Sequence, residues 1–406
     1  MKKYKFIDLF AGCGGLEDGF LQSGKYQDIA AVEWLKPQVN TLINRLETKW
    51  NVKDAKERVM HFDIQREDEL FGGWNDEEFG TGKGLDYFVD KSNGIDIIIG
   101  GPPCQAYSIA GRVRDVNGMR DDYRNYLFEH YLSVVNRYRP KLFVFENVPG
   151  ILSAAPDGSP ITEKIREGFK GIGYEIIEDL RIAKVNASDY SVPQNRDRMI
   201  IVGIDSQKYS NIQELLHLFY DEMLPKYKGV RKYTVKDAIG DLPKCLPYYD
   251  DEHHNTKKSH SIPESKISWH TPRYHNRRDM DTFKLLAEDI ETGRREFDSK
   301  KISELYEQKI GSKSPIHRYH VLEPNMPSTT IIAHLYKDGN RFIHYDSTQS
   351  RSITVREAAR LQSFDDDFEF IGSQGNAYQM IGNAVPPKLA KAISFAIADL
   401  LAKMEE

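Results

Sequence analysis

The sequence predicts a doubly wound α/β domain accompanied by a smaller, irregular domain. Short apolar runs alternate with helical patterns over residues 1 to about 205, glycine-rich turns follow several of these runs, and the alternation then stops. Such alternation is typical of βαβ units around a parallel sheet. We expect residues 1–205 and 376–406 to form the α/β domain and residues 206–375 the smaller one.

Six strands are expected in the α/β domain, near residues 5–10, 29–33, 95–99, 142–145, 174–181 and 199–204. Helices are expected after Gly15, after Pro37 and over residues 124–138. A last helix is expected over residues 385–406, because two prolines open it and Leu389, Ile393 and Ile397 follow at helical spacing. This helix should dock on the core.

Residues 206–350 are rich in His, Lys, Arg, Pro and Tyr. Between His253 and Arg278, six basic residues accompany one acid, Glu264, five histidines and two aromatic residues. The basic residues are Lys257, Lys258, Lys266, Arg273, Arg277 and Arg278. The cluster predicts a phosphate-binding face. A solvated polar surface is the alternative.

The composition is that of an ordinary globular protein, with 40% apolar and 29% charged residues. No apolar run approaches the roughly 20 residues of a membrane helix, and no secretory signal precedes the first strand. The three cysteines, Cys13, Cys104 and Cys245, lack metal-type spacing, so we expect neither disulfides nor a bound metal. We expect a cytoplasmic protein. The net charge of −5 does not exclude nucleic acid, because local clustering of charge determines a binding face.

A glycine-rich turn, DLFAGCGG at residues 8–15, directly follows the first predicted strand. Doubly wound sheets bind nucleotide-like ligands at this position. The spacing matches neither the dinucleotide fingerprint nor a phosphate loop, which favours a ligand without a pyrophosphate. A tight strand-to-helix turn without a ligand is the alternative.

Two acids follow at places suited to an adenosyl group. Glu33 ends the second predicted strand, where a carboxylate accepts hydrogen bonds from ribose hydroxyls, and Trp34 offers an aromatic face beside it. Asp63 is a candidate partner for the adenine amino group. Each acid taken singly is more often a surface residue, but the combination favours S-adenosylmethionine as the cofactor.

Cys104 lies in the segment GGPPCQ, residues 100–105, which follows the predicted strand at 95–99. The glycines and prolines predict a rigid, non-helical turn at the carboxyl edge of the sheet. A lone cysteine is usually a small buried apolar residue. On such a loop, however, a thiol ionises and acts as a nucleophile when neighbouring groups lower its pKa.

Glu146 ends the next predicted strand, so its carboxyl group is expected beside the cysteine loop. Apolar surroundings raise the pKa of such a carboxyl group and suit it to donate a proton or hydrogen bond to a heterocycle. Arg196 and Arg198 precede the strand at 199–204, on one side of an extended segment. They suit contacts to the substrate and to phosphate. An ordinary strand-terminal acid is the alternative for Glu146.

Together these segments resemble the DNA cytosine C5-methyltransferases, of the prokaryotic restriction–modification type. Six motifs occur in family order: DLFAG at 8–12, PPCQ at 102–105, ENV at 146–148, QNRDR at 194–198, REAARLQSF at 356–364 and GNAVPP at 382–387. One departure is Asp365, where the family commonly has proline, which puts only the local loop geometry in doubt. The resemblance implies a Rossmann-like, S-adenosylmethionine-dependent methyltransferase with residues 206–375 as its target-recognition domain.

The resemblance also implies residue roles. The expected cofactor contacts are Asp8, Phe10, Gly12, Gly14, Glu33, Trp34, Asp63, Ile64, Pro102, Leu127, Asn383 and Val385. The expected DNA contacts are Gln105, Ser108, Arg112 and Thr330, although Thr329 lies next to the last of these. Residues 106–123 are expected to close over DNA, with an inert surface loop as the alternative.

The implied reaction begins when Cys104 attacks carbon 6 of cytosine, which makes carbon 5 electron-rich. Glu146 donates a hydrogen bond or proton to ring nitrogen 3, Arg198 binds the base carbonyl, and Arg196 holds Glu146 or a phosphate. The base must first leave the duplex, because stacking covers its faces. Carbon 5 then takes the methyl group, loses its proton and releases the thiolate.

Two rival functions remain. A tRNA cytosine methyltransferase uses the same catalytic set, but that branch tends to carry a Phe-Thr pair near the nucleophile, where this chain has Ala106, Tyr107 and Ser108. A catalytically silent DNA-binding relative would lack the nucleophile or the acid. The expected partners are double-stranded DNA and a cognate restriction endonuclease, with the chain itself monomeric, off the membrane and nucleoid-associated through DNA.

Overall fold

The computed structural model describes residues 3–102, 127–155, 158–264, 266–311, 319–337 and 339–406. The chain forms two compact units. The sheet unit lies within Met1–Tyr190, Arg196–Val230 and Val385–Glu406, and the second unit within Ser191–Asn195 and Arg231–Ala384. No helix in the described ranges has the length and apolarity to cross a membrane.

The boundaries of these units differ from the expected ones at 205/206 and 375/376. Residues 206–230 stay with the sheet because the Tyr220 hydroxyl donates to the carbonyl of Ile200 (2.8 Å) and accepts from the amide of Val202 (3.0 Å). Residues 376–384 belong to the second unit, where the buried Tyr378 donates to the carbonyl of Ile353 (2.8 Å). The short segment Ser191–Asn195 also joins the second unit.

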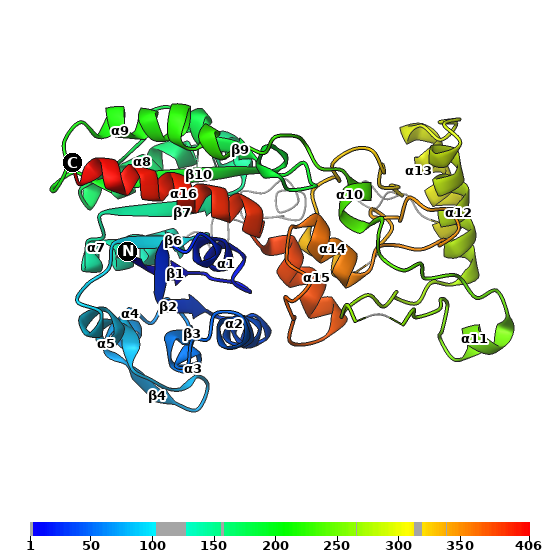
Figure 1. The fold of residues 1–406 in the computed structure, drawn as a ribbon, viewed down its shortest axis with the longest axis horizontal. Coiled ribbons are helices and arrows are strands. Elements are labelled where there is room, and N and C mark those ends of the chain that lie inside the picture. The colour runs from blue at the N-terminus through cyan, green and yellow to red at the C-terminus, as the bar shows by residue number, and fades with distance from the viewer. Residues whose placement is uncertain (1–2, 103–126, 156–157, 265, 312–318, 338) are drawn as a thin grey trace. The chain divides into compact units, whose positions relative to one another are not determined.

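An eight-stranded sheet forms the centre of the sheet unit, with the order β3-β2-β1-β6-β7-β10-β8 and β9 paired to β10 (Figure 1). Its strands are β1 (Tyr4–Leu9), β2 (Tyr26–Glu33), β3 (Val59–His61), β6 (Ile97–Gly100), β7 (Leu142–Asn147), β8 (Tyr174–Ile176), β9 (Lys184–Asn186) and β10 (Asp197–Asp205). The first five in spatial order are parallel. Such a sheet is buried on both faces and needs continuous apolar strands, which is why Leu142–Phe145 and Ile97–Ile99 are fully apolar and buried.

The expected α/β sheet is present and mostly parallel, but one of its strands runs in the opposite direction. β10 runs antiparallel to β7, β8 and β9. The expected strand at 174–181 is also shorter, because β8 ends at Ile176 and a 3₁₀ helix, η4 (Leu180–Ala183), begins where the Asp179 side chain accepts from the amide of Arg181. Periodicity alone does not give strand direction, and a local cap ends a strand that apolar residues would continue.

Helix α16 (Pro387–Met404) packs against α1 (Gly15–Gln22) and returns the end of the chain to the sheet unit (Figure 1). The helices approach closely at Gly19, where a Cβ atom would lie 2.3 Å from Cβ of Ala390. The Tyr26 hydroxyl also donates to the carbonyl of Ser394 at 2.6 Å. The expected terminal helix is therefore present and docked on the core.

The other elements of the sheet unit are α2 (Lys36–Thr48), α3 (Ala55–Arg58), α4 (Glu67–Gly72), the hairpin of β4 (Trp74–Asp76) and β5 (Gly80–Gly82), α5 (Gly84–Lys91), α7 (Leu127–Tyr138), η3 (Pro149–Ser153), α8 (Ile161–Gly171), η5 (Ala187–Tyr190), α9 (Ile212–Leu218), η6 (Phe219–Met223) and η7 (Pro225–Tyr227). Those of the second unit are α10 (Val235–Ile239), α11 (Asp251–Asn255), α12 (Arg277–Glu291), α13 (Ser299–Ile310), η8 (Ala333–Tyr336), α14 (Val355–Leu361) and α15 (Gln374–Asn383).

The second unit is more regular than expected, since α12 and α13 occupy a region that was predicted to be irregular. Both helices have side-chain caps, Asn276 and Asp298. Phe283 and Leu286 of α12 pack with Ile343 in a buried apolar core. Both helices contain many charged residues, so the spacing of their apolar residues is difficult to recognise in the sequence.

The basic cluster between His253 and Arg278 divides into surface and core. Lys257, Lys258 and Lys266 are exposed, whereas His260, His270 and His275 are buried. Arg277 is bound to Asp251 at 3.1 Å. The histidines thus belong to the interior of the second unit, and only part of the cluster is available to phosphate.

A buried charged network fixes the start of α14. The carboxylate of Glu357 accepts two hydrogen bonds from Arg351 (2.6 and 2.7 Å) and faces Nε2 of His344 at 3.5 Å. Nδ1 of His344 accepts from the amide of Asp346, which requires the proton on Nε2. Burial is the main cause that lowers the pKa of His344 to about 4, and Arg351 and His270 lower it further against Glu357 and Asp346.

We predict that acid destabilises the second unit below pH 6.5. The folded protein keeps His344 neutral down to about pH 4, whereas the unfolded chain takes up a proton near 6.5, so the free energy of unfolding falls between these values. The loss from this group is on the order of 3 kcal/mol. Denaturant unfolding at pH 7, 6, 5 and 4.5 measures it. His344→Gln should reduce the slope, and an unchanged slope would contradict the assignment.

Candidate active site

The candidate site residues of the sheet unit gather at one edge of the sheet. The strand order reverses between β1 and β6, with β2 and β3 on one side and β7 on the other. The carboxyl ends of parallel strands share an edge, and ligands of such folds bind where the order reverses. Because β10 is antiparallel, its amino end, with Arg196 and Arg198, reaches the same edge.

The glycine-rich turn after β1 has a left-handed backbone at three positions. Phe10 and Gly12 both have φ of 58°, and Gly14 has φ of 86°. Phe10 is not a glycine, so this conformation is strained, and such strain tends to occur at functional sites. Gly14 also lacks room for a side chain, since a Cβ atom would lie 2.5 Å from Cδ1 of Leu42. The turn is closed by a hydrogen bond from the amide of Gly14 to the carbonyl of Ala11 (2.9 Å).

Glu33 joins this turn to the end of β2. Its carboxylate accepts from the amides of Gly12 (2.9 Å) and Leu35 (2.7 Å). Burial raises the pKa of Glu33, and these amide hydrogen bonds act in the opposite direction. The neighbouring Trp34 is 47% exposed. The structure thus joins Gly12 of the turn directly to Glu33 at the end of β2.

Asp8 presents a buried carboxyl group at the same edge. Its side chain is 1% exposed, and Oδ2 has no hydrogen-bond partner among the described residues. Burial and the nearby Glu33 raise its pKa. A buried polar atom without a partner is costly, so this oxygen suits a donor group of a ligand.

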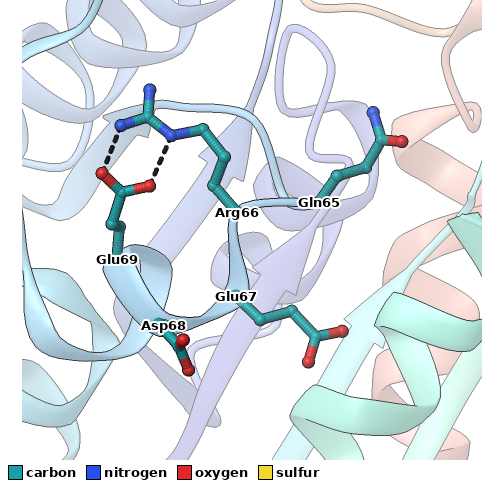
Figure 2. Close-up of a pocket in the computed structure, with 5 residues that line it drawn as sticks. All are labelled: Gln65, Arg66, Glu67, Asp68 and Glu69. Carbon is teal, nitrogen blue, oxygen red and sulfur yellow. Dashed lines mark hydrogen bonds and ion pairs between the residues drawn. The ribbon is translucent and has the colours of Figure 1, made fainter.

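Asp63 and Ile64 follow β3, next to a surface pocket lined by residues Gln65 to Glu69 (Figure 2). Asp63 accepts from the amide of Gln65 at 3.0 Å, and Ile64 is buried. Arg66 is paired with Glu69 across the pocket, and Glu67 accepts from Ser133 of α7 at 2.7 Å. The pocket therefore adjoins two expected cofactor contacts but contains none of them.

The segment that leads to Cys104 leaves β6 at Gly100, and Gly101 and the buried Pro102 follow. Cys104, Gln105, Ser108 and Arg112 lie outside the described residues, as does the whole loop at 106–123 that is expected to close over DNA. Leu127, the first residue of α7, is buried. The expectations for the undescribed residues stay predictions.

Glu146 and Arg198 form a nearly buried ion pair, with Nε of Arg198 2.8 Å from Oε1 of Glu146 and both side chains about one-eighth exposed, at 12% and 13%. Ile200 of β10 lies opposite Glu146 of β7, so Arg198 stands just beyond the end of β7. Burial raises the pKa of Glu146, whereas Arg198 and then Arg196 lower it. Arg196 is fully buried, and burial is the main cause that lowers its pKa. A guanidinium nevertheless stays charged, since its ordinary pKa is so high.

Gly101 leaves the space in which the Glu146 carboxylate lies, a role that the sequence analysis did not identify. A Cβ atom on Gly101 would lie 2.6 Å from Oε2 of Glu146. Its φ lies outside the left-handed region, so glycine is needed here for space. The doubled glycine before the two prolines was the available signal.

Three expected site residues lie outside this part of the sheet unit. Thr330 and Asn383 belong to the second unit, where the Thr330 hydroxyl donates to the carbonyl of Asn195 at 2.7 Å and Asn383 is the exposed last residue of α15. The adjacent Thr329 is exposed. Val385 begins the last segment of the sheet unit and is buried.

The fold and the edge site define a Rossmann-like methyltransferase. Residues 4–399 match the family of C-5 cytosine-specific DNA methylases. The chain belongs to this family and is a DNA (cytosine-5)-methyltransferase.

Its relatives include bacterial type II methyltransferases. M.Bpa9945I of Bacillus paralicheniformis is 31% identical over 97% of this chain and 98% of its own. M.XorII of Xanthomonas oryzae pv. oryzae is 32% identical over 98% of this chain and 86% of its own. Among solved structures, an E. coli protein described as a prophage-encoded DNA modification methyltransferase gives a TM-score of 0.59 at 27% identity, covering 98% of this chain and 100% of that one. The Dnmt2 methyltransferase of S. pombe, at 16% identity and a TM-score of 0.55, shows the same fold.

We predict that Gly101→Ala lowers the methylation rate at saturating substrates by about 100-fold, because the added methyl group displaces the Glu146 carboxylate from Arg198. Thermal unfolding should change little, since the displaced atom is the end of a flexible side chain. Gly171→Ala is the control, because a Cβ atom there meets nothing within 4 Å. Equal rates for the two variants would show that this space is not needed.

Proposed function

We propose that this chain transfers a methyl group from S-adenosylmethionine to carbon 5 of a cytosine that is rotated out of a specific double-stranded DNA sequence, through a covalent bond to Cys104. The observation that supports this most strongly is the Glu146–Arg198 ion pair, at the edge where the loop toward Cys104 leaves β6. A carboxyl group of raised pKa beside an arginine is suited to bind and protonate a heterocycle.

The residues after β1 and β2 fit S-adenosylmethionine. Glu33 offers carboxylate oxygens for ribose hydroxyls, and the buried, unpartnered Oδ2 of Asp8 suits a donor of the cofactor. When bound, the cofactor supplies an electrophilic methyl group on a sulfonium. We propose the remaining contacts at Phe10, Gly12, Gly14, Trp34, Asp63, Ile64, Pro102, Leu127, Asn383 and Val385.

In this proposal Cys104 forms a bond to carbon 6 of the cytosine, and the displaced electron pair moves into the ring. Glu146 gives a proton or hydrogen bond to ring nitrogen 3, which lets the ring accept that density. Arg198 orients Glu146 and binds the base carbonyl. Arg196 is a second cation that lowers the pKa of Glu146. After methylation, loss of the carbon 5 proton and departure of the thiolate restore the aromatic ring.

We propose the second unit as the target-recognition domain. The exposed Lys257, Lys258 and Lys266 suit phosphate contacts, and Thr330, Gln105, Ser108 and Arg112 are proposed DNA contacts. The type II names of the relatives support a modification enzyme that protects DNA from an endonuclease with the same target sequence. We propose in addition that the chain acts as a monomer.

We predict that Cys104→Ser abolishes transfer of labelled methyl groups to duplex DNA but leaves DNA binding within about threefold, because serine lacks a thiolate at neutral pH. Unmethylated genomic DNA and bulk tRNA serve as parallel substrates for the unaltered protein. Labelling of tRNA alone would overturn the proposed substrate. Activity retained in Cys104→Ser would remove this residue from the mechanism.

We predict that Glu33→Ala weakens S-adenosylmethionine binding by about 10- to 100-fold, since it removes a charged acceptor and releases the amides of Gly12 and Leu35. Isothermal titration with the cofactor measures the change. Glu47→Ala, on a half-exposed glutamate of α2, should bind as the unaltered protein does. Equal affinities of the two variants would place the ribose elsewhere.

A further inference from the structure

The chain passes from the second unit into the sheet unit between Asn195 and Arg196. Arg196 and Arg198 therefore follow this crossing by one and three residues. Gln194, just before the crossing, has no role in the reaction proposed above, yet its side chain is fully buried.

Gln194 uses each polar group of its side chain within the second unit. Its Oε1 accepts from the amide of Ile331 at 2.9 Å. Its Nε2 donates to the carbonyl of Leu361 (3.1 Å) and to Oε1 of Gln362 (2.6 Å). One side chain thus binds the backbone at Ile331 and the end of α14 at the same time.

The backbone beside Gln194 is held equally firmly. The amide of Ser328 donates to the carbonyl of Pro193 (2.9 Å), and the amide of Asn195 donates to the carbonyl of Ser328 (2.8 Å). The Thr330 hydroxyl donates to the carbonyl of Asn195 (2.7 Å). The last residue before the crossing is therefore bonded directly to a proposed DNA contact.

The other side of the crossing is also fixed from its first residue. The carbonyl of Arg196 accepts from the amide of Ala187 (2.9 Å), and Asp197 accepts from the Asn186 side chain (2.8 Å). Arg198 pairs with Val185 of β9. Asn195, Arg196 and Asp197 each make a hydrogen bond, so every residue between Gln194 and Arg198 is held in place.

We propose that Gln194 is a positioning residue, which anchors the crossing so that the second unit sets the position of Arg198 against Glu146. The inference rests on the proposed function, because it assigns Arg198 and Glu146 to the reaction and Thr330 to DNA. DNA held at Thr330 would thereby be linked through Asn195, Arg196 and Asp197 to Arg198 of the catalytic ion pair. A role confined to stabilising the second unit is the competing explanation.

The test compares Gln194→Met with Gln349→Met. Methionine keeps the volume of glutamine but removes its hydrogen bonds. Gln349 is also buried in the second unit and accepts from the amide of Cys245 (3.0 Å) and from Arg351 (2.6 Å), and within the described ranges it makes no hydrogen bond to residues 191–195. Gln362→Met serves as a milder variant, because it removes only one of the three hydrogen bonds of Gln194.

Each protein is tested for thermal unfolding, for its Kd for unmethylated genomic DNA, and for its single-turnover rate of methylation against pH. We expect Gln194→Met to lower the rate by about 10- to 100-fold with a Kd within about threefold. We also expect activity to persist to higher pH. Displacement of Arg198 removes the cation that most lowers the pKa of Glu146, so Glu146 keeps its proton to higher pH. Gln362→Met should change the rate and the pH profile less than Gln194→Met does. The effects of the two substitutions should not add in a variant that carries both.

Gln349→Met should lower stability without moving the pH profile. The proposal is overturned if Gln194→Met and Gln349→Met lose stability and rate in the same proportion with unchanged pH profiles. If Gln194→Met does not fold, an unaltered rate and profile in Gln362→Met overturns it. Failure of the proposed function is a separate result, seen as an unaltered protein that does not methylate DNA or as a Cys104→Ser variant that still does.

Discussion

The ion pair of Glu146 and Arg198 depends on β10, the strand that runs antiparallel to its neighbours near one end of this sheet. Were β10 parallel to β7, Arg198 would lie at the opposite edge, and Glu146 would be an isolated acid in apolar surroundings. The reversal brings a cation from the amino end of one strand to an acid at the carboxyl end of the next. A nearly buried ion pair contributes little net stability, because desolvation offsets the attraction. Its geometry is therefore better explained by chemistry at the edge than by the stability of the fold.

The same edge holds acids that the fold does not compensate. Asp8 has one buried oxygen without a partner, and both carboxylate oxygens of Glu17, on α1, are buried without a partner among the described residues. Burial is the main cause that raises the pKa of both groups. The charge of Glu33 raises the pKa of Asp8 further, and the charges of Asp28 and then Asp8 raise that of Glu17. These acids accordingly hold protons more tightly than exposed ones, which lowers the cost of burying them. These unpartnered carboxyl groups thus lower the stability of the sheet unit near the place where its ligands are proposed to bind.

Much of this arrangement was predictable, for a physical reason. The strands that end at Leu9, Glu33, Gly100 and Asn147 are nearly continuous apolar runs, and the chemical groups follow each run directly, so strand ends and site residues could be located together. Strand direction was not predictable, because side-chain alternation is the same in parallel and antiparallel strands. The helices α12 and α13 were missed because many charged residues dilute their apolar pattern. The buried histidines resembled a basic surface because sequence does not show which polar residues find partners inside.

Gly101 and Gln194 have roles that sequence patterns do not reveal. Gly101 leaves space for the Glu146 carboxylate, and Gln194 makes hydrogen bonds to residues that are far away in the chain. Neither is itself a reacting group, yet they act on the same pair from different sides. Gly101 limits where the Glu146 carboxylate lies, while the anchored crossing determines where Arg198 begins. A carboxyl group suited to protonate a base needs both constraints, because its pKa depends on burial and on the distance to its arginine together.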